Sequence, residues 1–351
     1  MATPTLAHED EGAGAGHTEQ VLHLTGAHPV SLGAGLTIVT QGVDGSDGAR
    51  GGTTYSVDIA LESEMGNGGT AFIYINSAQG TGAVTDPAGG NEPLSGINGD
   101  NETGDLSAEG YSETRVAEAW VNLPVGDMAS LTVGKIDPTG IYDANEYAND
   151  ETSQFLNGAF VNNLAIAFPG YVGGASLAVE TGNTAVNLGV FESGGEFGGV
   201  FDDAFLVAEV AQGMEWNGLM GNARLTYWST PSGNNNDNNG IALSIDQEVS
   251  ETVGVFARYG TYDDDVTSGY DAAYSLGFQA EMEPCVVGVG YGALTAVSAS
   301  ADDEQVVEAY LSHSLSDNLT LTLDLQSITG ANLSATVKDT TVFGARLQVD
   351  L

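Results

Sequence analysis

The sequence predicts an all-β fold, a 16-stranded antiparallel transmembrane β-barrel with an inward-folded constriction loop. Three observations support this fold class. Short runs rich in Val, Leu, Ile, Thr, Tyr and Phe recur along the chain, apolar and polar residues alternate within them, and short and long connections alternate between them. No stretch approaches the roughly 18 consecutive apolar residues that a membrane-spanning helix needs, so any passage across a membrane must use strands.

Alternation of apolar and polar residues is clearest near the end of the chain. In residues 319–326, leucines alternate with Thr, Asp and Gln, and residues 55–62 and 274–281 follow the same two-residue period. In residues 343–351, apolar side chains again occupy every second position. Each predicted strand therefore has one apolar and one polar face. Strands of a β-sandwich share this pattern, so the connections must distinguish the two folds.

The connections favour a barrel, because transmembrane barrels join strands by short turns on one side and by longer loops on the other. The segment 160–168 resembles one more strand, but counting it would move every later long loop to the wrong side. It is therefore assigned to a loop, and both termini then lie on the side of the short turns. The short turns are predicted near residues 66–68, 125–128, 182–183, 214–218, 250–251, 283–284 and 316–318, and the long connections at 43–53, 79–114, 137–170, 193–203, 230–239, 263–270, 296–303 and 330–340.

The charge balance excludes several classes of function. The chain has 48 acidic and 7 basic residues, a formal net charge of -41, which excludes nucleic acid as a partner and favours cations. Catalytic and phosphate-binding motifs such as GxSxG, HExxH and the P-loop are absent. The sequence therefore predicts that the protein is not an enzyme and that it uses no cofactor and no defined metal site. The single cysteine, Cys285, has no partner for an intramolecular disulfide.

The chain is predicted to have two parts. Residues 1–31 contain four of the five histidines among several acidic residues, and we expect them to form a periplasmic tail. Residues 32–351 contain the predicted strands and form the barrel domain. The N-terminal residues show neither the basic region nor the apolar region of an export signal, which indicates a processed chain.

Two segments resemble a known family. Leu131–Asn163 reads LTVGKIDPTGIYDANEYANDETSQFLNGAFVNN and Val253–Gly260 reads VGVFARYG, and both resemble the carbohydrate-selective (OprB-like) porins of Gram-negative outer membranes. Together with the strand layout, the resemblance covers most of residues 32–351. It implies that the first segment enters a loop that folds toward the barrel interior and narrows the pore. The chain is shorter than typical members of that family and has very few basic residues.

Side chains alternate between the two faces of a strand, and this alternation places several charged side chains in the lumen. The inward loop adds further carboxylates. An acidic loop facing a basic wall would orient dipolar solutes and filter ions by charge. Alternatively, the arginines hold the loop through carboxylate pairs and create no selectivity, because bidentate pairing suits the guanidinium group. The predicted pore-lining and constriction residues are Asp58, Glu62, Glu118, Asp137, Asp143, Glu146, Asp150, Glu151, Arg224, Arg258 and Arg346.

These features predict a porin of the bacterial outer membrane for the passive diffusion of small hydrophilic solutes, either sugars or cations or both, through an acidic pore. The expected partners are outer-membrane lipid and these solutes, and a homotrimer is left open. The alternative is a secreted or surface-attached acidic protein, such as an adhesin or a layer component, stabilised by calcium on its Asp-rich loops. The alternation of connection lengths and the loop motif favour the porin.

Overall fold

The computed structural model describes most of the chain at the level of individual residues. Statements about structure below refer to these residues only. The described residues are 20–22, 30–44, 50–66, 68–81, 96–100, 111–193, 204–231, 237–263, 270–297, 303–330 and 339–351.

The described residues form strands almost throughout, with two short helical turns in one connection. The helical turns are the 3-10 helix η2 (Pro138–Gly140) and the α-helix α1 (Gly158–Val161). The strands are β1 (Gln20–Leu22), β2 (Val30–Asp44), β3 (Arg50–Glu64), β4 (Thr70–Thr81), β5 (Tyr111–Pro124), β6 (Ala129–Ile136), β7 (Val172–Thr181), β8 (Thr184–Glu192), β9 (Ala204–Trp216), β10 (Leu219–Pro231), β11 (Asp237–Ser250), β12 (Val253–Tyr262), β13 (Tyr270–Met282), β14 (Cys285–Ala296), β15 (Glu304–Ser316), β16 (Leu319–Thr329) and β17 (Thr340–Asp350).

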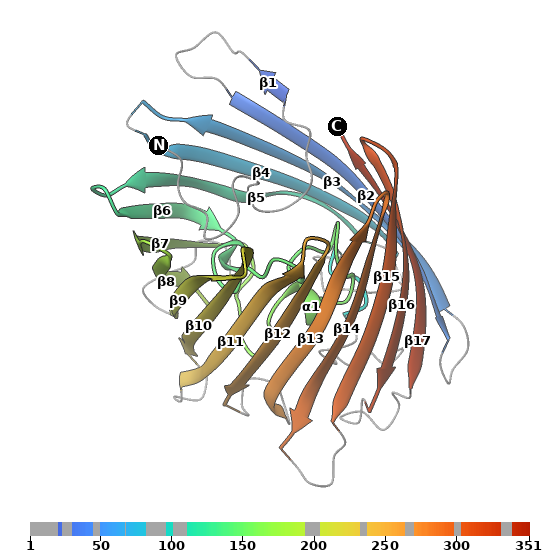
Figure 1. The fold of residues 1–351 in the computed structure, drawn as a ribbon. Helices are drawn as coiled ribbons and strands as arrows, with labels where there is room; N and C mark the ends of the chain where they lie inside the picture. The colour runs from blue at the N-terminus through green and yellow to red at the C-terminus, as the bar shows by residue number, and fades with distance from the viewer. Residues whose placement is uncertain are drawn as a thin grey trace.

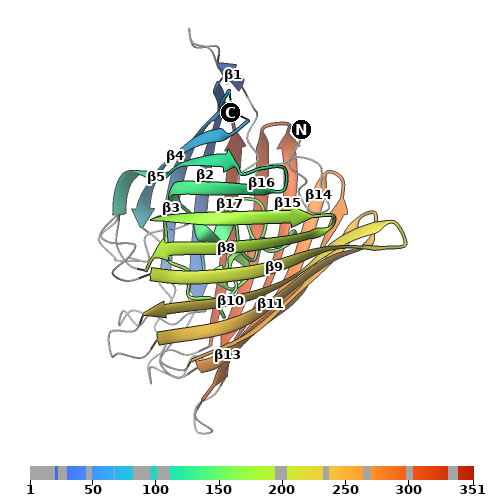
Figure 2. The ribbon, with the colours of Figure 1, turned by 90° about the vertical axis from the view of Figure 1, so that its left-hand side faces the viewer.

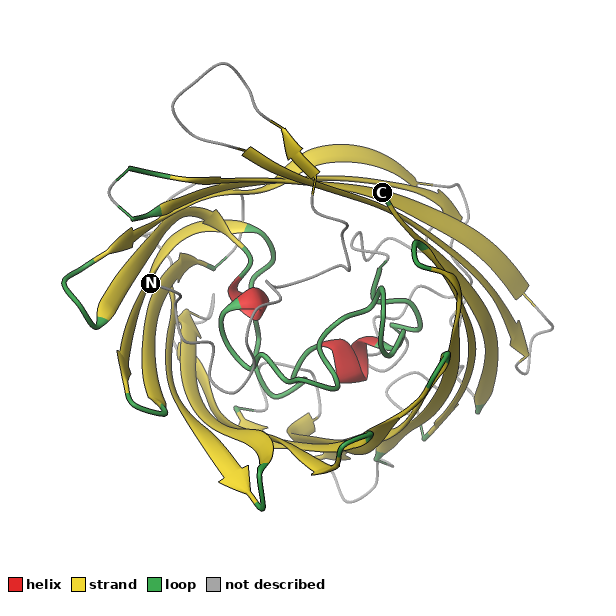
Figure 3. Cartoon of the chain, turned by 45° about the horizontal axis from the view of Figure 1, so that its top comes forward, coloured by secondary structure: helices red, strands yellow, loops and turns green. Residues whose placement is uncertain are grey.

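The strands close into a barrel. Among the described residues the sheet has 17 strands, and the sixteen from β2 to β17 form a ring because β17 pairs with β2. Neighbours along the chain are neighbours in the ring, and their pairing is antiparallel. The ring is visible from above in Figure 3, and the tilted strands of its wall in Figures 1 and 2. The predicted 16-stranded antiparallel barrel is confirmed.

The connections follow the predicted order of short turns and long loops. The segment 160–168 lies inside the long connection between β6 and β7, and its only regular part is the end of α1. The C-terminus lies beside the short hairpins at the upper end of the barrel in Figure 1. The separate tail at residues 1–31 stays a prediction. Most of it lies outside the described residues, β1 pairs with the start of β2, and β2 begins at Val30.

The barrel is apolar outside and polar inside, the reverse of a soluble protein. On β16, Thr322, Asp324 and Gln326 are buried, whereas Leu323 and Leu325 between them are exposed to 53% and 45%. Most other strands of the ring repeat this arrangement, and their half-exposed leucines, valines and tyrosines form an outer band. Such a surface is stable only against lipid, because a soluble protein rarely exposes a continuous apolar band of this extent.

Candidate channel constriction

The connection between β6 and β7, residues 137–171, folds into the barrel, and its residues 137–170 are called the constriction loop below (Figure 3). Local capping shapes its two helical turns. The Asp137 side chain accepts hydrogen bonds from the backbone N–H and the hydroxyl of Thr139 (2.9 and 2.8 Å), which starts η2. The Asn157 side chain accepts from the N–H of Ala159 (2.9 Å) and starts α1 in the same way.

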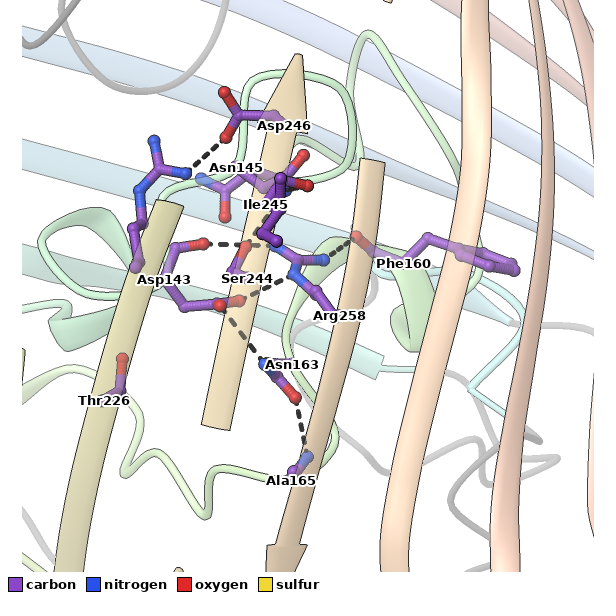
Figure 4. A network of polar contacts seen from close by, with 12 residues as sticks. Asp143, Asn145, Phe160, Asn163, Ala165, Thr226, Ser244, Ile245, Asp246 and Arg258 are labelled. Carbon is purple, nitrogen blue, oxygen red and sulfur yellow. Dashed lines mark hydrogen bonds and ion pairs between the residues drawn. The ribbon is translucent and has the colours of Figure 1, made fainter. Parts of the chain in front are cut away.

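An ion pair between Asp143 and Arg258 attaches the first half of the loop to the barrel wall (Figure 4). The Arg258 Nε atom lies 2.8 Å from the Asp143 carboxylate, and the two side chains are only 1% and 3% exposed. Arg258 also donates to the carbonyl oxygens of Phe160 (2.8 Å) and Asp143 (3.2 Å). Burial raises the pKa of the Asp143 carboxyl, and the guanidinium group of Arg258 acts against this rise.

Neighbouring strands add further contacts to the loop. The backbone N–H of Asp143 donates to the Glu209 carboxylate on β9 (2.8 Å). The Asn145 side chain donates to the Ser244 hydroxyl on β11 (3.1 Å). The Trp228 indole of β10 donates to the carbonyl oxygen of Ala165 (2.8 Å). The loop is therefore held to β9, β10, β11 and β12 by buried hydrogen bonds.

A second anchor holds the loop near α1. The Glu308 carboxylate on β15 accepts from the backbone N–H groups of Leu156 (2.6 Å) and Asn157 (2.9 Å). Arg346 on β17 donates to the carbonyl oxygens of Glu151 (2.7 Å) and Gln154 (3.0 Å). Carboxylate and guanidinium groups thus satisfy backbone groups that would otherwise be buried without partners.

Aromatic packing fills the space between the two anchors. The ring centroid of Phe155 lies 4.8 Å from that of Phe160, 5.6 Å from that of Phe256 and 5.0 Å from that of Tyr310. Gly290 on β14 leaves room for them, because a Cβ atom there would approach the Phe160 ring to 2.7 Å. The loop is therefore a packed part of the barrel interior.

A second connection also reaches the interior. The described residues 96–100, called the inner segment below, belong to the long connection between β4 and β5. The carbonyl oxygen of Ile97 accepts from the side chains of Gln41 on β2 (2.6 Å) and Gln326 on β16 (2.9 Å). Asp100 accepts from the Ser56 hydroxyl on β3 (2.8 and 3.0 Å).

Half-buried aromatic side chains line the interior of β4 and β5, and with Tyr171 they form what we call the aromatic wall (Phe72, Tyr74, Trp120 and Tyr171). Phe72 stacks on Trp120 with centroids 4.9 Å apart, and Tyr74 lies 6.3 Å from Tyr171. The Arg115 guanidinium lies 4.8 Å from the centre of the Tyr171 ring.

Carboxylates border the aromatic wall. The Trp120 indole donates to Glu118 (2.9 Å), and Glu118 also accepts from the backbone N–H of Asp137 (3.2 Å). The Tyr74 hydroxyl donates to Asp58 (2.5 Å), which accepts in addition from the side chain of Asn76 (2.9 Å). Hydrogen-bonding groups therefore surround the rings on this side of the lumen.

The predicted site residues lie on three parts of the interior. Of the predicted residues, the structure brings three pairs into direct contact, Asp143 with Arg258, Glu118 with Asp137, and Arg346 with Glu151. Arg224 instead pairs with Asp246 of the neighbouring strand. Arg224 and Arg258 share one row across β11, since both are register partners of Ser244. The first part is the wall of β3 and β5, with Asp58, the exposed Glu62 and Glu118. The second part is the constriction loop, with Asp137, Asp143, Glu146, Asp150 and Glu151. The third part is the wall of β10, β12 and β17, with Arg224, Arg258 and Arg346.

Several buried carboxylates of the interior were not predicted as site residues from the sequence. Glu209, Asp246 and Glu308 occupy inward positions that strand alternation would have assigned to the lumen. The inner segment carries no such signal, because its main contact uses a backbone carbonyl oxygen.

Comparison with known proteins assigns the family. The model of the carbohydrate-selective porin, OprB family, matches residues 44–351. The chain belongs to this family. Its fold is similar to the high-pH structure of Pseudomonas putida OprB, with a TM-score of 0.74 and 14% identity, covering 91% of this chain and 94% of that one. An anion-selective porin from Comamonas acidovorans has a TM-score of 0.57 and 13% identity, covering 92% and 99%.

A further relative comes from Aquifex aeolicus (strain VF5). This protein, described as uncharacterized, is 27% identical over 233 residues, which are 66% of this chain and 68% of the relative. The two solved structures share only the fold with this chain at such low identity, whereas the family match covers nearly the whole barrel. The family match favours the porin over the adhesin or layer component. None of the helices in the described residues is long and apolar enough to span a membrane.

Proposed function

We propose that this porin lets small neutral sugars and small cations diffuse passively across the bacterial outer membrane, along a passage between the constriction loop and the aromatic wall. The pairing of half-buried rings with charged groups on that wall carries the proposal. Such a surface suits a sugar, because its C–H face packs on a ring while its hydroxyl groups bond to polar groups at the edge.

The excess of acidic residues supports the passage of cations. The formal net charge is -41, and Glu118 and Asp137 lie beside the aromatic wall. Screening with a Debye length of about 8 Å at physiological salt restricts the effect of these charges to narrow parts of the lumen. Neutral sugars respond little to this potential, so an acidic passage is compatible with both kinds of solute.

We further propose that Arg258 and Arg346 act mainly as clamps for the constriction loop. Both side chains are buried, and their hydrogen bonds go to loop residues and to a neighbouring strand. A guanidinium group engaged in this way has few donors left for a passing solute. Arg115, half-buried over Tyr171, is the cationic group proposed to meet the solute.

Planar bilayer recording of the purified porin tests the proposal. We expect stepwise channels, a reversal potential in a KCl gradient that indicates cation preference, and a current that added sugars block. Replacing Trp120→Ala should weaken the sugar block about two- to twelvefold, because loss of an aromatic contact costs about 0.5–1.5 kcal/mol.

Trp216→Ala provides the matched control, since this side chain is 60% exposed at the end of β9, and its sugar block should equal that of the wild type. Sugar-insensitive channels would remove the carbohydrate part of the proposal, and anion preference would remove the cation part. A water-soluble protein without channels would contradict both.

A further inference from the structure

The inner segment and the constriction loop are joined by backbone hydrogen bonds. The N–H of Gly99 donates to the carbonyl oxygen of Leu156 (2.6 Å), and the N–H of Gly158 donates to the carbonyl oxygen of Gly96 (2.9 Å). These two bonds run in opposite directions between segments that are far apart in sequence, as in an antiparallel pair of strands. The two connections therefore meet as one packed unit inside the barrel.

The inner segment leaves little freedom at this junction. Ile97 is only 1% exposed, and its carbonyl oxygen is shared by Gln41 and Gln326. Gln326 also accepts a hydrogen bond from the Asn157 side chain (3.0 Å), so a single glutamine of β16 touches both connections. Any displacement of the inner segment would break hydrogen bonds to the wall and to the loop together.

Gly99 is the tightest point of the junction. A Cβ atom at this position would lie 2.9 Å from the Glu151 Cβ, 3.0 Å from the Val161 Cγ2 and 3.3 Å from the Leu156 carbonyl oxygen. The first and last of these atoms move only with the loop backbone. A side chain at Gly99 would therefore push the inner segment and the constriction loop apart.

We propose that residues 96–100 are the second half of the constriction, and that Gly99 sets the aperture of the channel by its close contact with the constriction loop. Most hydrogen bonds of the joined unit go to β2, β3, β9–β12 and β15–β17, and further bonds reach Glu118 on β5 and Ser176 on β7. This location confines solutes to the side of the aromatic wall. The proposal rests on the proposed channel function and adds a positioning role for Gly99 and Gln326.

The test compares Gly99→Val with Gly42→Val by single-channel recording in planar bilayers. Gly42 is the matched control, because it lies on β2 between the inward, buried Gln41 and Val43 and a Cβ atom there meets nothing within 4 Å. We expect Gly99→Val to raise the conductance about twofold or more and to weaken the sugar block at least threefold. We expect Gly42→Val to retain wild-type values for both. The midpoint of thermal unfolding in detergent, measured in parallel, separates a change of aperture from a loss of stability.

A folded Gly99→Val porin with wild-type conductance and sugar block would overturn the proposal. If Gly99→Val does not fold, the double variant Gln41→Ala/Gln326→Ala, which removes both donors to Ile97, is assessed by the same two measurements. If the wild-type porin forms no conducting channel but the Gly99→Val variant does, the result would support the proposal, because the joined unit then closes the lumen of the wild type. Absence of channel conductance from the wild type and from every variant would overturn the channel function itself.

Discussion

Two regions of the barrel interior differ in how deeply their polar groups are buried. On β9–β12 and β15–β17, charged side chains are buried under the constriction loop, and their partners are loop atoms or neighbouring strands. On β4 and β5, rings and carboxylates stay half-buried around the aromatic wall. Buried charges of the first region serve to position the loop, whereas partly exposed groups of the second are available to a solute.

Glycines contribute to this difference at two places. Tyr147 of the loop packs directly over Gly254 on β12, at the place where a Cβ atom would otherwise lie, and Gly290 receives Phe160 similarly. Phe72 and Trp120 occupy inward positions on β4 and β5, so their rings take the space themselves. Rings of the loop thus fill the space over these two glycines, whereas rings of the wall fill it on β4 and β5.

The largest effect should follow from breaking the ion pair in the loop-covered region. Arg258→Met leaves the Asp143 carboxylate buried without its cation, which costs about 3–5 kcal/mol. The midpoint of thermal unfolding in detergent should fall strongly, and the channel should become wider. The double variant Arg258→Met/Asp143→Leu removes both charges and should regain much of the stability. A single variant as stable as the wild type would show that the pair does not hold the loop.

A smaller effect is expected at the second anchor. Glu308→Ala leaves the N–H groups of Leu156 and Asn157 without their acceptor, at a cost of about 2 kcal/mol. Conductance should rise and become noisier, because only one anchor of the loop is lost. Glu215→Ala, an exposed position at the end of β9, is the matched control and should behave as the wild type. Equal conductance of the two variants would contradict the anchor.

The smallest effect is expected on the aromatic wall. Glu118→Gln removes one negative charge beside Trp120 and keeps the shape of the side chain, so stability should change little. The preference for cations, measured as the reversal potential in a KCl gradient, should fall by less than about twofold and should fall least at high salt, where screening is strong. A complete loss of preference would mean that this single residue controls ion selectivity.

The constriction shows how far prediction from the sequence reaches. The alternation of side chains along the strands placed Arg258 and Arg346 on inward faces, and the loop motif placed Asp143 in an inward connection. The partners of the arginines could not be predicted from the sequence. Arg224 pairs with Asp246 of the adjacent strand, and Arg346 donates to carbonyl oxygens of the loop. Carbonyl groups are present at every residue, so no pattern in the sequence distinguishes those that accept a buried guanidinium group.

The sequence by itself determined the barrel and the number of its strands, and the resemblance of its loop motif to a porin family indicated the inward loop. A two-residue period and an alternation of turn lengths are local properties, and closure of the ring follows from them. Only the tertiary structure decided that residues 96–100 join the constriction loop and that one side of the lumen is covered while the other keeps its aromatic rings accessible. These features depend on contacts between residues far apart in the chain, which form only after the ring has closed.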